Sequence, residues 1–214
     1  MYRGKNNLIS LYQYYLSYLR YFVHLTLFFK KVYCAAFNFL FKQKYTKTNM
    51  YTIISSTNRP GSNTLKVAQH YQKLYAAAGV QASILSLMDI NPLTSSEAVK
   101  HAEQNILIPT TKFIFIVPEY NGSFPGVLKV LIDSLPRTVW TDKKASLTGV
   151  ALGRAGNIRG LDHLANIFHY FGITVLPQQL YLSQIDKLMN ESGEIIDAAA
   201  LQNIQNQIQR FIKL

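Results

Sequence analysis

The sequence predicts an α/β fold in which helices cover both faces of a five-stranded parallel sheet, a three-layer doubly wound arrangement. From residue 50 onward, short apolar runs alternate with longer segments of helical periodicity. The run Phe113–Val117 is apolar at every position, which is typical of a parallel strand buried on both faces. Polar loops that contain glycine follow the first, third and fourth runs, and ligands of such sheets bind beyond the carboxyl ends of the strands.

Strands and helices are predicted to alternate five times along this part of the chain. The strands are short runs that can lie in a sheet covered on both sides, and they are predicted at Tyr51–Ser56, Ala82–Leu87, Phe113–Val117, Leu147–Leu152 and Ile173–Leu176. The helices follow them in order at Thr64–Ala78, Ser95–Leu107, Pro125–Leu135, Gly160–Phe171 and Ala198–Leu214. In the last of these, Leu201, Ile204 and Ile208 fall on one face.

Charge and cysteine content separate residues 1–49 from the rest of the chain. The net charge is +11, but residues 1–49 hold eight Lys or Arg and no Asp or Glu, so residues 50–214 carry only +3. That small excess does not indicate nucleic acid as a partner. Cys34 is the only cysteine, which excludes an intrachain disulfide and fits a cytoplasmic protein.

Residues 1–49 form a basic, aromatic extension whose role the sequence leaves open. One alternative is an upstream segment outside the functional protein, because Met50 directly precedes the first strand. A second is a basic aromatic helix over Leu8–Phe41 that lies on a membrane or on another subunit; a targeting peptide is a third. A spanning helix is not expected, because basic residues interrupt every apolar window. Residues 50–214 are predicted to be the working domain.

The loop after the first strand has the composition of an anion site. It combines hydroxyl, amide and guanidinium side chains directly before a helix, whose first N–H groups and dipole attract a phosphate. The candidate ligands are Thr57, Arg59, Ser62, Asn63 and Thr64. Because no GxGxxG or GxxxxGK[ST] is present, a phosphate monoester is favoured over a pyrophosphate. A plain turn capped by Ser62 or Asn63 is the alternative.

The loop after the third strand suits a flat aromatic ligand. It places Pro118, Glu119, Tyr120 and Asn121 at the carboxyl edge of the sheet. The ring of Tyr120 can form a wall, and the backbone amides of Glu119, Tyr120 and Asn121 can meet the polar edge of a heterocycle such as an isoalloxazine. The alternative is an Asn-Gly turn followed by a proline at the start of a helix.

The loop after the fourth strand, residues 153–160, contains three glycines and two arginines. Glycine permits close approach of backbone to ligand, and the two arginines, Arg154 and Arg159, could favour an anionic reduced flavin or hold a phosphate of a nicotinamide nucleotide. A solvated arginine is the alternative.

These three loops, STNRPGSNT, PEYNGSFPGVLKVLID and GRAGNIRGLDHL, resemble in order and spacing those of the NAD(P)H-dependent FMN reductases, which include chromate, quinone and azo reductases. The resemblance covers residues 51 to about 185. It implies a flavodoxin-like fold with strand order 2-1-3-4-5, bound FMN, NADPH or NADH as donor, a small-molecule acceptor and a homodimer or homotetramer.

Roles carried over from the resemblance assign each loop to a part of FMN. The phosphate would be bound by Thr57, Arg59, Ser62, Asn63 and Thr64. The flavin ring would contact Pro118, Glu119, Tyr120 and Asn121, and its far edge Gly153, Arg154 and Gly156. Two features depart from the family pattern. Pro60 and the Ser55–Ser56 pair stand where many relatives have a basic residue and a glycine, and the GRAGN loop replaces the commoner Ser-Pro-Gly type.

No catalytic acid, base or nucleophile is predicted, because the cofactor supplies the chemistry. No metal site is predicted either, since His163 and His169 fall on different helix faces, and His70 and His101 are expected in solvent. The apolar segment from Pro125 to Trp140 is expected at a subunit interface. Two alternatives remain open: an FMN-binding electron carrier of flavodoxin type, and a flavin-free interaction module.

Overall fold

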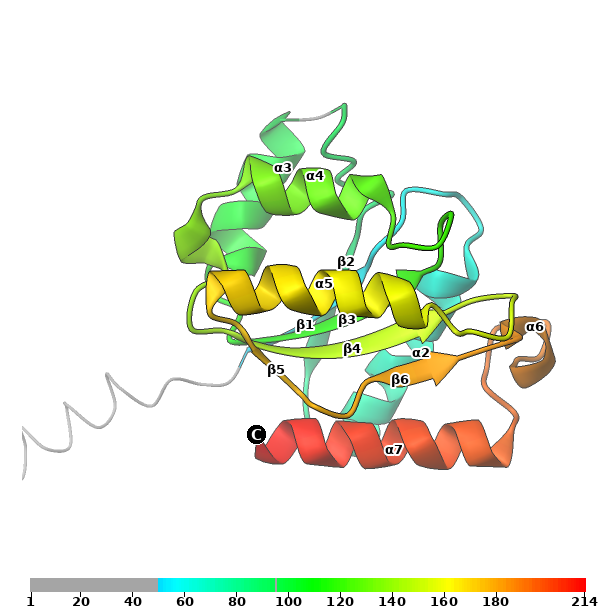
Figure 1. The fold of residues 1–214 in the computed structure, drawn as a ribbon. Coiled ribbons are helices and arrows are strands. Elements are labelled where there is room, and N and C mark those ends of the chain that lie inside the picture. The colour runs from blue at the N-terminus through cyan, green and yellow to red at the C-terminus, as the bar shows by residue number, and fades with distance from the viewer. Residues whose placement is uncertain (1–49, 95) are drawn as a thin grey trace, which may run out of the picture. The chain divides into compact units, whose positions relative to one another are not determined.

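The structure, a computed structural model, describes residues 50–94 and 96–214 (Figure 1). Its strands are β1 (Tyr51–Ser55), β2 (Ala82–Ser86), β3 (Lys112–Pro118), β4 (Lys144–Val150), β5 (Thr174–Val175) and β6 (Leu180–Leu182). They form one parallel sheet in the order β2-β1-β3-β4-β5, and β6 also pairs with β4. The predicted order 2-1-3-4-5 is confirmed. The predictions for residues 1–49 lie outside the described residues.

Helices cover both faces of this sheet. They are α2 (Asn63–Ala77), α3 (Ser96–Ala102), α4 (Gly126–Ser134), α5 (Ile158–Phe171), α6 (Ile185–Leu188) and α7 (Ala198–Lys213), with a π-helical turn η1 (Glu103–Leu107) and a 3₁₀ turn η2 (Arg137–Val139). Figure 1 shows α4 and α5 on one face of the sheet and α7 on the other. One apolar core includes residues of α3, α4 and α5, and a second includes those of α2 and α7. The three-layer prediction is therefore confirmed.

The fifth place in the sheet is divided between two short strands. The prediction was a single strand, Ile173–Leu176, but only Thr174 and Val175 pair with β4 before the chain leaves the ladder. Pro177 has no N–H to donate to a ladder. The chain returns as β6, where Leu180 pairs with Thr148. A three-residue strand carries too little periodicity to be predicted from sequence.

Lysines at the amino edge of the sheet hold the ends of helices. The buried Lys112 Nζ donates to the carbonyl oxygens of Phe211 (3.0 Å) and Ile212 (2.9 Å) at the end of α7. Lys144 Nζ donates to the carbonyl of Leu214. Cations at a helix C-terminus satisfy free carbonyls and the helix dipole. β4 begins at Lys144, three residues before its predicted start, because Lys144 already pairs with Lys112 of β3.

Two aromatic side chains differ from their predicted surroundings. Trp140 is completely buried, with its ring 5.5 Å from that of Phe113, so it belongs to the core and is not available to a subunit interface. His70 was expected in solvent, but both of its ring nitrogens are buried with no hydrogen-bond partner among the described residues. Burial lowers its pKa, since the charged form is poorly solvated there.

The described residues form neither a cluster of metal ligands nor a helix that could span a membrane. Within residues 50–94 and 96–214, no three His, Cys, Asp or Glu side chains are grouped closely enough to hold a metal ion. In the same residues, no helix has the length and apolar character needed to cross a bilayer.

Candidate FMN site

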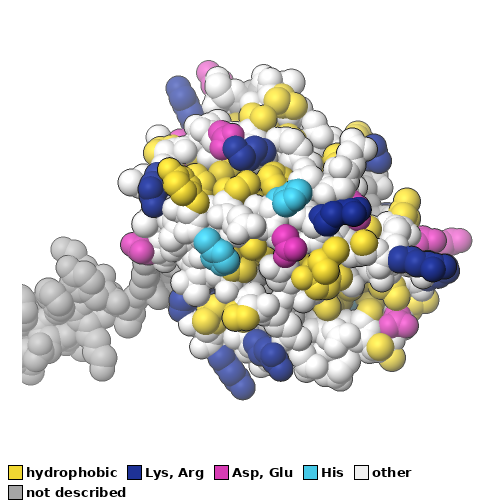
Figure 2. Space-filling view, in the orientation of Figure 1, with side chains coloured by type: hydrophobic (Ala, Val, Ile, Leu, Met, Phe, Trp, Pro, Cys, Tyr) yellow, Lys and Arg dark blue, Asp and Glu magenta, His cyan; other side chains and the backbone are white. Residues whose placement is uncertain are grey.

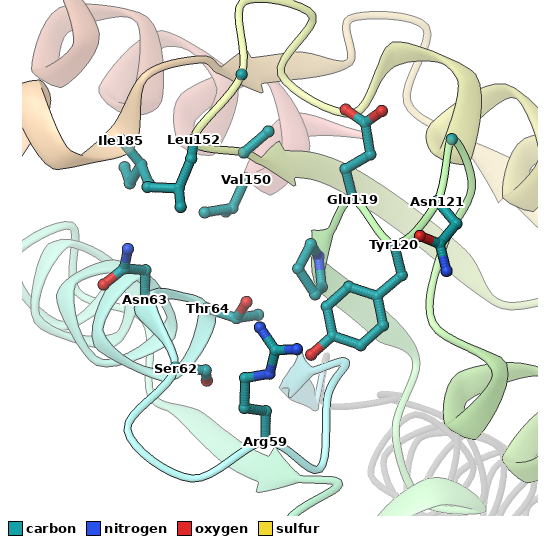
Figure 3. A pocket seen from close by; sticks show the side chains of 14 residues that line it. Arg59, Ser62, Asn63, Thr64, Glu119, Tyr120, Asn121, Val150, Leu152 and Ile185 are labelled. Carbon is teal, nitrogen blue, oxygen red and sulfur yellow. The ribbon is translucent and has the colours of Figure 1, made fainter.

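A cavity of about 430 Å³ opens at the carboxyl edge of the sheet. Its walls come from all three loops predicted to carry the site, and from α6. Figure 3 shows these side chains arranged around a common space, with Arg59 and Tyr120 on one side and Leu152 and Ile185 across from them. The volume lies in the range of pockets for small molecules and cofactors.

The N-terminus of α2 forms the polar end of the cavity. Ser62 is the N-cap, and its Oγ accepts a hydrogen bond from Leu65 N–H at 3.3 Å. Among the described residues, the backbone N–H groups of Asn63 and Thr64 have no acceptor, while the side chains of both residues line the cavity. Free N–H groups at the positive end of a helix dipole bind an anion such as a phosphate.

Arg59 brings a positive charge to the same end. Gly61, two residues later, has φ +65°, a conformation that costs little only for glycine. The guanidinium of Arg59 lies 5.2 Å from the centre of the Tyr120 ring, within the range of a cation–π contact. Figure 3 shows this group directed into the cavity between Thr64 and Tyr120. The charge is thus placed where a phosphate at α2 can be reached.

Thr57 is buried next to the cavity and holds two residues of its wall in place. Its side chain is 1% exposed, and its Oγ1 is 2.6 Å from the hydroxyl oxygen of Tyr120. The same Oγ1 accepts a hydrogen bond from Arg59 N–H at 3.2 Å. Thr57 therefore joins the β1 loop to the β3 loop and does not line the cavity itself.

The β3 loop turns sharply at the rim of the cavity. Asn121 and Gly122 both have positive φ, 51° and 78°, and Tyr120 and Ser123 are hydrogen-bonded to each other across the turn. Residues at such positions are typically Asn and Gly. The turn presents the ring of Tyr120 to the cavity (Figure 3).

One prediction for this turn, that the backbone amides meet a ligand, is wrong for Glu119 and Tyr120 and stays a prediction for Asn121. Glu119 N–H donates to the carbonyl of Val150 at 3.2 Å, and Tyr120 N–H donates to Ser123 at 2.8 Å. Both amides are used inside the fold, so they are not free to meet a ligand. The N–H groups of Asn121 and Gly122, at the tip of the turn, have no acceptor among the described residues and could serve instead.

An apolar wall faces the polar end. It consists of Val150, Ala151, Leu152 and Ile185, and Leu152 is 68% exposed although it is apolar. None of the four was predicted as a site residue. Val150 to Leu152 were predicted as the last residues of the fourth strand, which in fact ends at Val150. Ile185 follows the unpredicted strand β6, so no sequence signal placed it here.

The β4–α5 loop is fixed by one asparagine and two glycines. Asn157 is fully buried in a left-handed conformation, φ 68°, and its Nδ2 donates to the carbonyls of Val117 (3.1 Å) and Pro118 (3.0 Å). A Cβ added at Gly149 would lie 2.0 Å from the oxygen of Gly156, and one at Gly156 would lie 2.7 Å from Tyr181. The loop thus packs directly on the sheet.

Most of the predicted site residues meet at this cavity. Nine of them line it: Arg59, Ser62, Asn63, Thr64, Pro118, Glu119, Tyr120, Asn121 and Gly153. Three do not: Thr57 lies beneath, Gly156 packs on Tyr181, and the side chain of Arg154 is exposed. Gly122 lines the cavity but was not predicted. The roles of all twelve predicted residues toward FMN stay predictions.

The sequence of this chain matches a known protein family. Residues 51–187 match the sequence profile of the NADPH-dependent FMN reductases. The chain belongs to the NADPH-dependent FMN reductase family. The resemblance predicted from the three loops is confirmed.

Two curated relatives illustrate how far the similarity extends. A 2-hydroxy-1,4-benzoquinone reductase from a Burkholderia species is 26% identical over 103 residues, which cover 46% of this chain and 56% of that protein. The alignment thus spans only about half of that relative's length. The quinone reductase of Escherichia coli K12 is 26% identical over 178 residues, which cover 77% of this chain and 94% of the relative.

Solved structures agree with the fold. The flavoenzyme NAD(P)H:(acceptor) oxidoreductase FerB from Paracoccus denitrificans aligns with a TM-score of 0.65 at 20% identity, covering 77% of this chain and 95% of that one. A flavodoxin from Megasphaera elsdenii aligns with a TM-score of 0.51 at 14% identity, covering 77% of this chain and all of that one. The predicted flavodoxin-like fold is confirmed.

The residues of this FMN reductase family member fit the cofactor. The unpaired N–H groups at the N-terminus of α2, together with Arg59 in the preceding loop, suit a phosphate. Between the ring of Tyr120 and the apolar wall there is space for a flat ring system (Figure 3). Beside that wall, the N–H group of Gly153 has no acceptor among the described residues and can meet the polar edge of such a ring.

Proposed function

We propose that this protein is an NAD(P)H-dependent oxidoreductase that binds FMN in the cavity and reduces a small acceptor. One observation supports this proposal most strongly. The N-terminus of α2, which can bind a phosphate, and an apolar space beside the ring of Tyr120 belong to the same cavity. Membership of the NADPH-dependent FMN reductase family supports the same cofactor and donor. When bound, FMN supplies the redox chemistry, accepting a hydride from NAD(P)H and passing electrons on.

The chain contributes binding and orientation. The N-terminus of α2 and the side chain of Arg59 would hold the phosphate of FMN and so anchor one end of the ligand. Tyr120, fixed by its hydrogen bond to Thr57, sets the plane of the flavin ring. Val150, Leu152 and Ile185 keep water from one side of the ring, which raises the strength of the polar contacts at its edge.

Quinones are the acceptor class that we favour. An exposed Leu152 beside the cavity offers apolar surface to a flat, uncharged ring. Both relatives described above are named as quinone reductases of one kind or another. Azo compounds, chromate and free flavin are further acceptors consistent with an open ring face.

The spectrum of the purified protein tests the proposal. The full chain is expected to be yellow, with a flavin absorption band that bleaches on anaerobic addition of NADPH or NADH and returns when a quinone is added. A protein that stays colourless after incubation with FMN would contradict FMN binding. The control is the same titration with free FMN at equal concentration.

An electron carrier of flavodoxin type is the second candidate, favoured only by the shared fold. It would hold FMN but not react directly with NAD(P)H. A yellow protein whose band resists both nucleotides would identify it.

For assembly and location we propose a homodimer or homotetramer in the cytoplasm. Ile158, an apolar side chain at the start of α5, is 44% exposed, and a second copy could cover it. The single cysteine is consistent with a reducing compartment. Sedimentation analysis measures the subunit number.

A further inference from the structure

Arg159 lies at the rim of the FMN cavity without being part of its wall. It belongs to the first turn of α5. Its guanidinium lies 3.6 Å from a carboxylate oxygen of Glu119 and close to Gly122, where an added Cβ would be 3.7 Å from Arg159 Nε. Glu119 and Gly122 both line the cavity. The positive charge therefore borders the opening, on the side of the β3 turn.

The guanidinium is held only weakly in this position. Its side chain is 68% exposed, and 3.6 Å is too long for a direct hydrogen bond. Exposed ion pairs of this kind contribute about 0–1 kcal/mol. Within residues 50–94 and 96–214, no carboxylate other than Glu119 lies within 4.0 Å of it. Arg159 can thus turn toward a ligand at little cost.

His163 lies one helical turn beyond Arg159, on the same face of α5. Its Nδ1 is 2.9 Å from Ser123 Oγ, so the imidazole is anchored to the same β3 turn. When Nδ1 accepts from that hydroxyl, Nε2 carries the proton and can donate. Asp162, which lies between them in the sequence, is near Tyr181, whose pKa is raised by burial and then by the charge of Asp162.

The surface around these two side chains does not have the character of a polyanion site. Figure 2 shows the face of the molecule that carries α5, where basic, acidic and histidine side chains are interspersed. A guanidinium and an imidazole one helical turn apart on α5, without a broad positive surface, suit a single compact anion. The anion must also belong to a ligand other than FMN, whose phosphate we place at α2 with Arg59.

We propose that Arg159, assisted by His163, binds the 2′-phosphate of NADPH and makes the enzyme prefer NADPH to NADH. This inference rests on the proposed function. NADPH and NADH differ only in this phosphate monoester, and a planar guanidinium matches its oxygens in pairs. Glu119 keeps Arg159 at the rim in the absence of the phosphate.

Binding of adenine nucleotides to the FMN-loaded protein tests the inference directly. Calorimetry should give tighter binding of 2′,5′-ADP than of ADP to the wild type. Arg159→Ala should weaken 2′,5′-ADP by about ten- to a hundredfold, the value of a charge-assisted hydrogen bond, and ADP by less than twofold. The affinity of Arg159→Lys for 2′,5′-ADP should lie between those of the wild type and Arg159→Ala. Equal weakening of both nucleotides would place the arginine at the 5′-phosphates and overturn the assignment.

Steady-state kinetics gives an independent measurement. The kcat/KM for NADPH should fall about tenfold or more in Arg159→Ala, with that for NADH unchanged within twofold. Arg210→Ala is the matched control, because Arg210 is exposed on α7 and has the same charge. An unchanged NADPH to NADH ratio in Arg159→Ala would refute the inference while leaving the oxidoreductase intact. A wild type that oxidises neither nucleotide would instead refute the proposed function.

Discussion

At the scale of single residues, the hydroxyl of Thr57 determines where the most prominent side chain of the cavity stands. It is buried, lies 2.6 Å from the hydroxyl oxygen of Tyr120, and accepts from the backbone of Arg59. One oxygen thus couples the phosphate end of the site to its ring end. A residue outside the cavity wall can in this way control ligand binding.

Thr57→Val should weaken FMN binding about fivefold, because it removes a hydrogen bond of about 1 kcal/mol while keeping the shape of the side chain. FMN fluorescence, measured during titration of the apoprotein, gives the dissociation constant. Thr138→Val, at an exposed position of η2, is the control and should bind FMN normally. Wild-type affinity in Thr57→Val would mean that Tyr120 needs no support from this hydroxyl.

Arg59→Ala should weaken FMN binding by about tenfold or more, because it removes the charge-assisted contact to the phosphate. Arg59→Lys should retain part of the affinity, since the charge remains but the paired donors are lost. Riboflavin, which has no phosphate, separates the two roles of the arginine. Its binding should be insensitive to Arg59→Ala, and equal losses for riboflavin and FMN would contradict contact with the phosphate.

At the scale of elements, Asn157 fastens the β4–α5 loop to the end of β3. Asn157→Ala should lower the free energy of unfolding by about 2–4 kcal/mol, because two buried carbonyls lose their donor and alanine disfavours a positive φ. Urea unfolding monitored by circular dichroism measures the change. Asn203→Ala, exposed on α7, should be neutral; a neutral Asn157→Ala would show that packing alone fixes the loop.

Sequence patterns predicted the long elements well and the short ones poorly. Runs such as Phe113–Val117 could be predicted as strands because each position is apolar, and each is buried in the structure. The strand β6 and the helix α6 were missed, since three or four residues show no period. The start of β4 was misplaced because its first residues pair with β3 and β5, and such pairing is not visible in the periodicity of one segment.

The polar residues of the cavity were predictable from the sequence, and the apolar ones were not. Arg59, Ser62 and Tyr120 were predicted as site residues because polar and aromatic residues of loops at the carboxyl edge of a parallel sheet commonly bind ligands. Ile185 and Leu152 were not found, since an apolar residue gives no sign of whether it faces the core or a ligand. Gly156 and Asn157 belong to a glycine-containing loop whose tight packing on β4 and β6 only the structure displays.

At the scale of the whole molecule, buried tyrosines link stability to pH. Burial raises the pKa of Tyr51, Tyr71 and Tyr75 above the usual value. The folded state therefore keeps phenolic protons that the unfolded state loses above about pH 10. The stabilisation is intact below that pH and declines as pH rises. Burial lowers the pKa of Lys112, which has the opposite and, for one group against three, smaller effect.

Tyr75→Phe tests this linkage without removing a hydrogen bond, since the described residues offer none to the Tyr75 hydroxyl. The free energy of unfolding should fall between pH 10 and 11 in the wild type. In the variant the fall should be shallower by up to about 1.4 kcal/mol per pH unit, the value for one titrating group. Urea denaturation at pH 8, 10 and 11 measures it. If the free energy of unfolding fell equally steeply with pH in both proteins, Tyr75 would not contribute to the pH dependence.

The lysines at the amino edge of the sheet give the last turn of α7 an unexpected importance. Lys112 is 2% exposed, and the carbonyls of Phe211 and Ile212 are its hydrogen-bond acceptors. Deleting the final four residues would strand an ammonium group inside the protein beside the start of a central strand. A tag meant for purification is therefore better appended after Leu214 than substituted for the residues before it.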